Sequence, residues 1–200
     1  MPTQSIVEEI YTHEYLWRSG TAIVDRIEAK ADDAHHLALP ALLVTYLAYE
    51  AFINFAGHVL LPELWSREKE NFKGKPLEYK IERIASKLPS FEWRKGERPY
   101  QSVRQLSEFR DLVAHGKVQV NEYLAEPQND GTHFAFRHAW DVYLARDQLL
   151  RFREDTKAFC DALLASMRQA SEHPHLVFAA FEGSLASGAS ETQCRPKHKN

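Results

Sequence analysis

The stretch ALLVTYLAYEAFINFAGHVLL, residues 41–61, decides the fold of this chain. It is apolar on nearly every side of a helix, and such a helix is stable only when other elements cover it. Polar side chains interrupt the stretch every fourth residue, at Tyr46, Glu50, Asn54 and His58. A step of four residues drifts by only about 40° on an α-helix, so the four lie on one face. The stretch therefore predicts a buried central helix with one polar stripe.

The polar stripe has two interpretations. Buried polar groups need hydrogen-bond partners, so one interpretation is an internal ladder that fixes the register of a helical bundle. The other is that the stripe faces the same cleft as Arg110 and His115, in which case Glu50 and Asn54 support the site. The first interpretation is slightly favoured. Together with His58 these two residues make a poor zinc ligand set, so no metal site is predicted here.

Apolar residues recur at helical spacing in four further stretches, at about 5–31, 76–88, 100–115 and 144–170. The first begins with Ser5 and Glu8, a spacing typical of a helix capping box. The central helix itself begins between Asp33 and Pro40. We therefore expect an all-α, up-and-down bundle of about five helices, formed by residues 1–172.

Residues 116–142 have a different pattern, because apolar residues alternate around a segment rich in turn formers. This predicts a β-hairpin insertion between the last two helices, with strands near 117–124 and 132–140. Residues 173–200 contain many small and polar residues and are expected to form a flexible tail. We attribute His173 and His175 to a loop rather than to a metal site.

Composition limits the class of protein. The chain has 200 residues and a hydrophobic fraction of 44%, which fits one folded domain, and its net charge of −3 argues against a general polyanion binder. Two cysteines, Cys160 and Cys194, make no disulfide framework, so a reducing cytoplasm is expected. The first residues lack the pattern of a signal peptide. The polar residues in the longest apolar run argue against a membrane span.

The segment 67–104 is basic, with eleven Lys or Arg against six Glu, a local balance of +5. Such a run is commonly a solvated surface of mixed charge. It also fits a surface that tracks phosphates, with Phe91 and Trp93 available to stack on bases, and the two interpretations weigh about equally. The candidate RNA contacts at or near this segment are Lys87, Arg94, Lys95, Arg98, Arg104 and Lys117.

The stretch EFRDLVAHG, residues 108–116, predicts the last turns of a helix that stops at Gly116, because Gly there adopts a left-handed backbone without penalty. His115 then lies at the carbonyl end, with Asp111 four residues earlier on the same face. Arg110 is adjacent. On spacing alone, such residues are most simply complements to the helix dipole.

The sequence from Arg110 to Gly116 resembles the Arg-x4-His signature of the HEPN superfamily, in which a polar residue often follows the Arg and Ala-His-Gly often closes the motif. Residues 46–54 resemble the long central helix of that family, with its inward Glu and Asn. The resemblance covers roughly residues 5–170. It implies a homodimer with a composite site at its interface and a metal-independent endoribonuclease of toxin–antitoxin or phage-defence systems.

In such an enzyme the ribose 2′-hydroxyl attacks the phosphate. His115 can act as general acid or base, Arg110 can stabilise the charge that develops on phosphate oxygens, and Asp111 can orient the imidazole. Arg110 and His115 are about 140° apart on an ideal helix, so one helix does not easily aim both at one phosphate. Two copies across the dimer axis, which the resemblance implies, would supply both. No cofactor is expected.

The sequence departs from one branch of the family at Lys117, where HEPN toxins controlled by a nucleotidyltransferase partner carry a Tyr. Control by that type of antitoxin is therefore doubtful here. A non-catalytic HEPN module that dimerises or binds RNA or nucleotides in a regulatory assembly is the main alternative. A metal-dependent hydrolase using some of the ten histidines is a weaker one.

Overall fold

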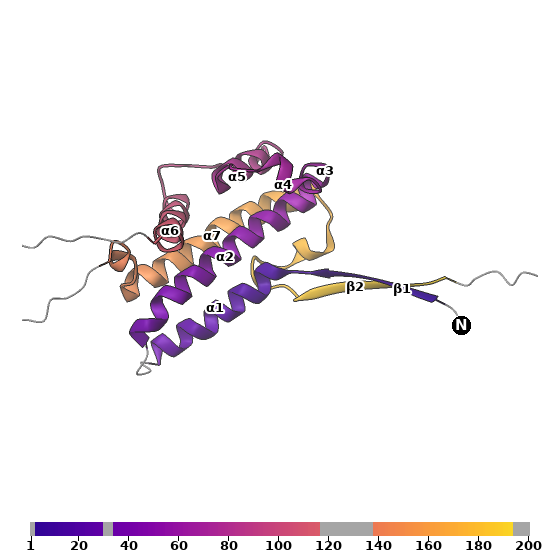
Figure 1. Cartoon of the computed structure of the whole chain (residues 1–200). Helices are drawn as coiled ribbons and strands as arrows, with labels where there is room; N and C mark the ends of the chain where they lie inside the picture. Colours follow the sequence, from indigo (N-terminus) through magenta and orange to yellow (C-terminus); the bar gives the residue numbers. More distant parts are fainter. Residues whose placement is uncertain (1–2, 30–33, 117–137, 194–200) are drawn as a thin grey trace, which may run out of the picture.

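The computed structural model describes residues 3–29, 34–116 and 138–193, and this part of the chain is mainly helical, as the sequence predicted (Figure 1). Its α-helices, in chain order, are α1 (Thr12–Glu28), α2 (Ala34–Leu60), α3 (Pro62–Trp65), α4 (Glu68–Asn71), α5 (Leu77–Ala85), α6 (Tyr100–Ala114) and α7 (Arg146–Ala170). Two short 3-10 helices, η1 (Asp141–Tyr143) and η2 (Pro174–Val177), flank α7. Two strands, β1 (Thr3–Ile10) and β2 (Ala186–Gln193), complete the described elements.

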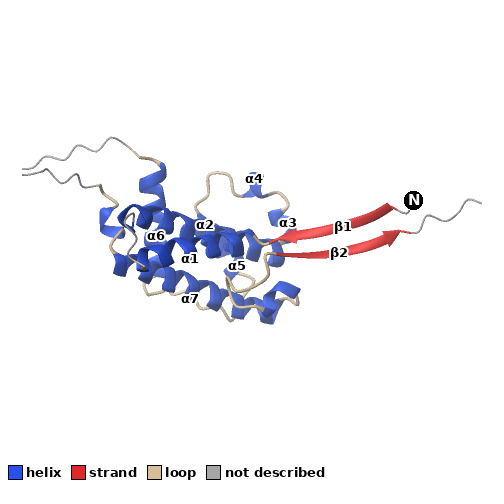
Figure 2. Cartoon of the chain, turned by 90° about the horizontal axis from the view of Figure 1, so that it is seen from below, coloured by secondary structure: helices blue, strands red, loops and turns tan. Residues whose placement is uncertain are grey.

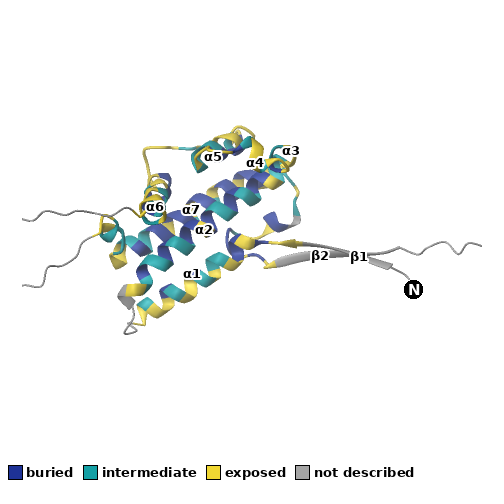
Figure 3. Cartoon of the chain, in the orientation of Figure 1, coloured by how far each residue is buried: buried dark blue, intermediate teal, exposed yellow. Residues whose placement is uncertain are grey.

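The predicted central helix is α2. It lies alongside α1 and α7 and also contacts α5 and α6, so that most of its sides are covered, as the near-continuous apolar pattern requires (Figure 3). Its largest fully buried side chains are Leu42, Tyr46, Tyr49, Phe52 and Ile53. By length and composition, residues 36–60 would also suffice to cross a membrane, a property that buried core helices share.

Helix α6, which carries the Arg-x4-His motif, packs on α2 and α7 through Val103, Leu106 and Phe109. Its start is anchored to α7 by the buried carboxylate of Asp155. That carboxylate accepts two hydrogen bonds from Arg98, at 2.6 and 2.8 Å, and one from the Ser102 hydroxyl, at 2.5 Å. The first turn of the motif helix is therefore fixed, while its last residues reach the surface.

The connection between α2 and α5 contains two helices of about one turn, α3 and α4. Trp65 in α3 packs directly on α2 at Gly57, where an added Cβ would lie 2.1 Å from the indole ring. Only glycine allows this approach, so Gly57 fixes where the chain turns back over the central helix.

Both ends of the chain correct the sequence predictions. Residues 3–10 form β1 instead of the first turns of a helix, and the helix begins at Thr12. β1 pairs antiparallel with β2, from Thr3 opposite Gln193 to Ile10 opposite Ala186, and the two strands project from the helices as a ribbon (Figure 2). The capping-box pattern at Ser5 is a local preference, and pairing with a strand about 180 residues away replaces it.

The predicted flexible tail, 173–200, is also wrong for most of its length. After α7 the chain forms η2, buries Leu176, Ala180 and Phe181 against the helices, and then enters β2. Burial of these apolar side chains offsets the entropy of ordering the segment, which local composition could not indicate.

Most of the predicted hairpin, 116–142, lies outside the described residues. Of its second strand, residues 138–140 are described and form a turn that leads into η1. Cys160 is buried in α7 as a free thiol, and Cys194 lies beyond the described segment.

Candidate functional site

Arg110 lies where the motif helix crosses the polar stripe of α2. Its Nη2 donates a hydrogen bond of 2.6 Å to the Tyr46 hydroxyl, and its guanidinium carbon lies 4.7 Å from the centre of that ring. Nη1 forms an ion pair of 2.7 Å with Asp111. The Nε atom is buried and has no hydrogen-bond partner among the described residues. Arg110 is therefore oriented by two neighbours, and its Nε donor is unused.

The electrostatics at this point favour a protonated Tyr46 and a charged Arg110. Burial raises the pKa of the Tyr46 hydroxyl above its ordinary value. Burial alone would lower the pKa of Arg110, but the Tyr46 hydrogen bond and the charges of Asp111 and Glu50 raise it. The pair presents a fixed cation with a phenol beside it, a combination that suits an anionic ligand.

The end of α6 differs from the prediction in two details. Asp111 contacts Arg110 and makes no side-chain contact with His115 in the described structure. The helix does stop where predicted, with His115 as its C-cap, but Gly116 is not left-handed; the backbone N–H groups of His115 and Gly116 close the last turn instead. The His115 side chain is exposed. No described residue fixes its ring, so any partner that orients it must come from elsewhere.

The polar stripe of α2 divides between three environments. Tyr46 binds Arg110, and Glu50 lines the same groove. The Asn54 side-chain oxygen accepts a hydrogen bond of 2.8 Å from Lys80, and His58 is exposed at a different pocket. Asn54 thus has a structural partner, and Glu50 lines the groove that contains Arg110.

This groove has a volume of about 410 Å³ and is lined by α2, α4, α5 and the end of α6. Its charged lining residues are Arg110, Lys69, Lys73, Lys75, Lys80, Glu50 and Glu68. Lys80 is neutralised by Glu68, but no described carboxylate pairs with Lys69 or Lys73. The groove therefore has an excess of positive charge around the motif arginine.

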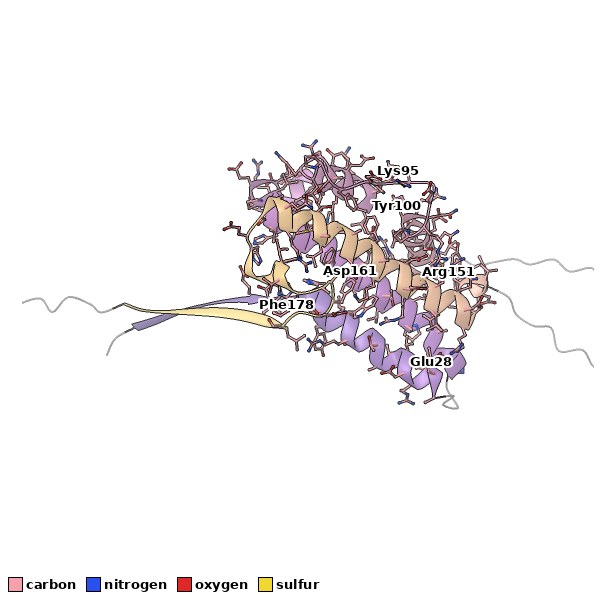
Figure 4. The ribbon with its side chains drawn as sticks, turned by 180° about the vertical axis from the view of Figure 1, so that it is seen from behind. Glu28, Lys95, Tyr100, Arg151, Asp161 and Phe178 are labelled. Atoms are coloured by element: carbon pink, nitrogen blue, oxygen red, sulfur yellow. The ribbon has the colours of Figure 1, made fainter. Side chains whose placement is uncertain are left out.

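These lysines belong to the basic segment 67–104, but they are not the ones selected from it as RNA contacts. The selected residues mostly pair with carboxylates: Lys95 with Glu78 and Glu82, Arg94 with Glu92 and Glu97, Arg98 with Asp155, and Arg104 with Glu108. Lys87 is exposed, and Lys117 lies outside the described residues. Figure 4 shows Lys95 and Tyr100 on the α5–α6 side of the molecule.

The aromatic side chains considered for base stacking are partly committed to the core. Phe91 is edge-on to Phe159 at 5.7 Å between ring centres, and Trp93 is edge-on to Tyr100 at 5.0 Å. Lys95 lies over the Trp93 ring at 4.4 Å. Both side chains are half-buried by these contacts.

A second group of polar residues lies away from the motif helix, and the sequence predicted no metal site there. His13 and Glu14 from the first turn of α1 and His175 from η2 are all buried, with one ligand-type atom of each lying within 4.8 Å of the others. Burial, and secondly His175, lowers the pKa of His13 to about 3. The sequence offered the His-x-His pair as a signal, but α1 is about 160 residues away.

No protein-family model matches this chain, and comparisons with curated proteins and with solved structures found no match. Membership of the HEPN superfamily therefore remains a prediction from the two motifs.

Proposed function

We propose that the chain is a metal-independent endoribonuclease of the HEPN type, with Arg110 and His115 carrying the reaction. The observation that supports this most directly is the position of Arg110, held by Tyr46 and Asp111 at the end of a groove with excess positive charge. A partly exposed arginine that two neighbours orient, lying beside lysines without a described carboxylate partner, is suited to a phosphodiester. We also propose the up-and-down bundle topology that the resemblance to this family implies.

In the proposed reaction Arg110 binds the scissile phosphate and stabilises the negative charge that grows on its oxygens. Lys69 and Lys73 hold the adjoining backbone by charge, without sequence preference. His115 removes the proton from the 2′-hydroxyl or protonates the leaving 5′-oxygen. The product ends are a 2′,3′-cyclic phosphate and a 5′-hydroxyl.

We propose that the active form is a homodimer in which the ends of two α6 helices meet. Two large apolar side chains near this end are exposed, Leu112 at 39% and Val142 at 72%. Tyr143, next to Val142, packs on Phe109 of α6 at 5.5 Å, so the two exposed side chains belong to one region. A partner would cover them and supply the groups that position His115.

The test is cleavage of a mixed RNA pool in EDTA by wild type, Arg110→Ala and His115→Ala, with Arg83→Ala as an exposed arginine control. Wild type and Arg83→Ala should cleave and leave cyclic-phosphate ends, and the other two should lose at least about a hundredfold in rate. Leu112→Asp should yield monomers without activity. Equal cleavage by His115→Ala and wild type would refute the assignment of the chemistry.

A non-catalytic HEPN module is the second candidate, and one observation favours it. Four of the cations expected to contact RNA are paired with carboxylates, which reduces the charge available to a nucleic acid. This alternative expects RNA or nucleotide binding in the groove, or dimerisation alone, with no cleavage by any variant. Both proposals include a cytoplasmic location and an antitoxin or other regulatory partner.

A further inference from the structure

The cluster of His13, Glu14 and His175 has the donor set of a transition-metal site. Two imidazoles and one carboxylate are a recurrent three-ligand set for zinc and related divalent ions. The His175 Nε2 atom lies 3.4 Å from Glu14 Oε1, and the His13 Nε2 atom lies 3.8 Å from the same oxygen. A tetrahedral ion with bonds of about 2.1 Å keeps its ligand atoms about 3.4 Å apart. Small side-chain adjustments would therefore close the cluster around one ion.

The Glu14 carboxylate is incompletely satisfied without a cation. Its side chain is fully buried, Oε1 accepts a hydrogen bond of 2.8 Å from the Gly183 backbone N–H, and Oε2 has no partner in the described structure. Although both imidazoles lie near Oε1, neither donates a hydrogen bond to it. Burying a carboxylate with an unpaired oxygen is unfavourable, and a coordinated cation removes that penalty.

The surroundings hold the three side chains in place. The His175 ring stacks on Tyr11 with 3.6 Å between ring centres, and the His13 ring packs on Phe55 at 4.9 Å. The segment that follows η2 closes over them. It begins at Phe178, which is labelled in Figure 4 and whose ring contacts that of His175. Such restriction of ring orientation is characteristic of pre-organised ligands.

Gly183 gives the cluster its space. A Cβ at this position would lie 2.4 Å from the His175 ring and 2.8 Å from Glu14 Oε1. The Gly183 carbonyl accepts a hydrogen bond of 2.6 Å from Arg18, so the backbone is held against α1. Nearby, Phe181 adopts φ of +67°, a strained conformation for a residue with a side chain, and stacks on Trp17 at 4.2 Å. These contacts help to hold the segment in its conformation.

A pocket of about 440 Å³ is lined by His13 together with His58, His173 and Asn54, and neither Glu14 nor His175 lines it. We propose that His13, Glu14 and His175 bind one divalent transition-metal ion of the zinc class. The site is separate from Arg110 and His115 and does not depend on the proposed ribonuclease activity. Its ligands join the start of α1 to η2, so the ion also fastens the C-terminal segment to the bundle.

The first experiment measures metal content and affinity directly. Full-length protein purified without chelator should contain close to one zinc per chain by mass spectrometry. Metal-free protein should bind Zn²⁺ stoichiometrically in competition with a chromophoric chelator, and Co²⁺ should give the visible spectrum of a low-coordinate His site. Absence of zinc in the preparation together with no binding in the competition assay would overturn the proposal.

The second experiment identifies the ligands. Glu14→Gln keeps an acceptor for Gly183 but loses the carboxylate, and His175→Asn removes a ligand; each should weaken zinc binding by at least about a hundredfold, more than the loss of an outer-shell partner causes. His58 lines the same pocket but is not part of the cluster, so His58→Asn is the control and should bind zinc as wild type does. If a ligand variant binds zinc with wild-type affinity, the assignment is wrong. If Glu14→Gln does not fold, the zinc affinities of His175→Asn and Gly183→Ala test the ligand assignment instead.

These results are independent of RNA cleavage. Zinc binding without cleavage would leave this site intact and refute only the proposed ribonuclease. Cleavage in EDTA without any zinc binding would support the proposed ribonuclease and refute the zinc site.

Discussion

The end of α6 and the start of α1 are two polar sites built in opposite ways. The residues of the first, Arg110, Asp111 and His115, lie within six positions of one helix, are partly exposed and are incompletely oriented. The second joins His13 and Glu14 to His175 across most of the chain; all three are buried, and aromatic rings hold both imidazoles. The first is easy to find in a sequence and incomplete in one chain. The second shows in the sequence only as the His-x-His pair at 173–175 and is nearly complete in one chain.

This difference suggests different requirements. Under the proposed function, the motif at the exposed helix end gains its missing partners from a second copy or from a nucleic acid. A buried cluster must satisfy its polar groups within the fold, and an ion is the simplest way to do so when hydrogen bonds are lacking. The following predictions test whether the two regions are independent in stability and in chemistry.

The largest effect is expected from Leu106→Ala, which removes a fully buried side chain between α6 and the core. The cavity and the lost burial should lower the free energy of unfolding by about 3 kcal/mol, measured by urea titration. Gln101→Ala, on the exposed side of α6, is the control and should change stability little. Zinc bound per folded chain should be unaffected, and a change in it would show that the two regions are coupled.

Acid should destabilise the metal-free protein through the buried cluster. Burial lowers the pKa of His13 from 6.5 to about 3, so the unfolded chain takes up a proton that the folded chain does not. The stability contributed by neutral His13 is fully present above pH 6.5 and is lost as the pH falls toward 3. Between pH 6 and pH 4 this amounts to about 2.5 kcal/mol, seen as a fall in the urea midpoint in EDTA. His13→Asn should have a shallower profile, and an unchanged slope would contradict the prediction.

Gly183→Ala should disturb the cluster without touching the motif. The new methyl group would collide with the His175 ring and with Glu14, so a loss of about 2 kcal/mol and a clear loss of zinc affinity are expected. Gly96→Ala is the matched control, because nothing lies within 4 Å of its added Cβ. Thermal unfolding with and without zinc measures both effects. Wild-type zinc affinity in Gly183→Ala would mean that the ligands lie elsewhere.

The smallest change in stability is expected from Tyr46→Phe, which removes the hydroxyl that accepts a hydrogen bond from Arg110. Arg110 is one-third exposed, so water can replace the lost partner, and stability should fall by less than about 1 kcal/mol. Under the proposed function, single-turnover RNA cleavage should still slow several-fold, because the guanidinium is less well oriented. Tyr15→Phe, at an exposed tyrosine of α1, should leave both quantities unchanged.

The sequence by itself determined the mainly helical class, the central helix and the limits of α5, α6 and α7 to within a few residues. Each of these follows from periodicity within one stretch, where local apolar spacing and tertiary burial agree. It also located Arg110 and His115 at the end of a helix. The contact of Arg110 with Tyr46 was not predicted, although the common polar face of α2 indicated that some such partner was needed.

The tertiary structure alone decided what depends on distant pairing. Strand β1 replaced a plausible helix start because β2 provides hydrogen bonds from the other end of the chain. The lysines that surround Arg110 are not the cations that the sequence position suggested as RNA contacts. Carboxylates elsewhere in the fold pair with several of those suggested cations, such as Lys95 and Arg98. The cluster of His13, Glu14 and His175 exists only because η2 folds back onto α1. The local sequence pattern reflects the conformational preference of each residue, whereas ion pairing, strand pairing and metal coordination depend on which segments meet in space.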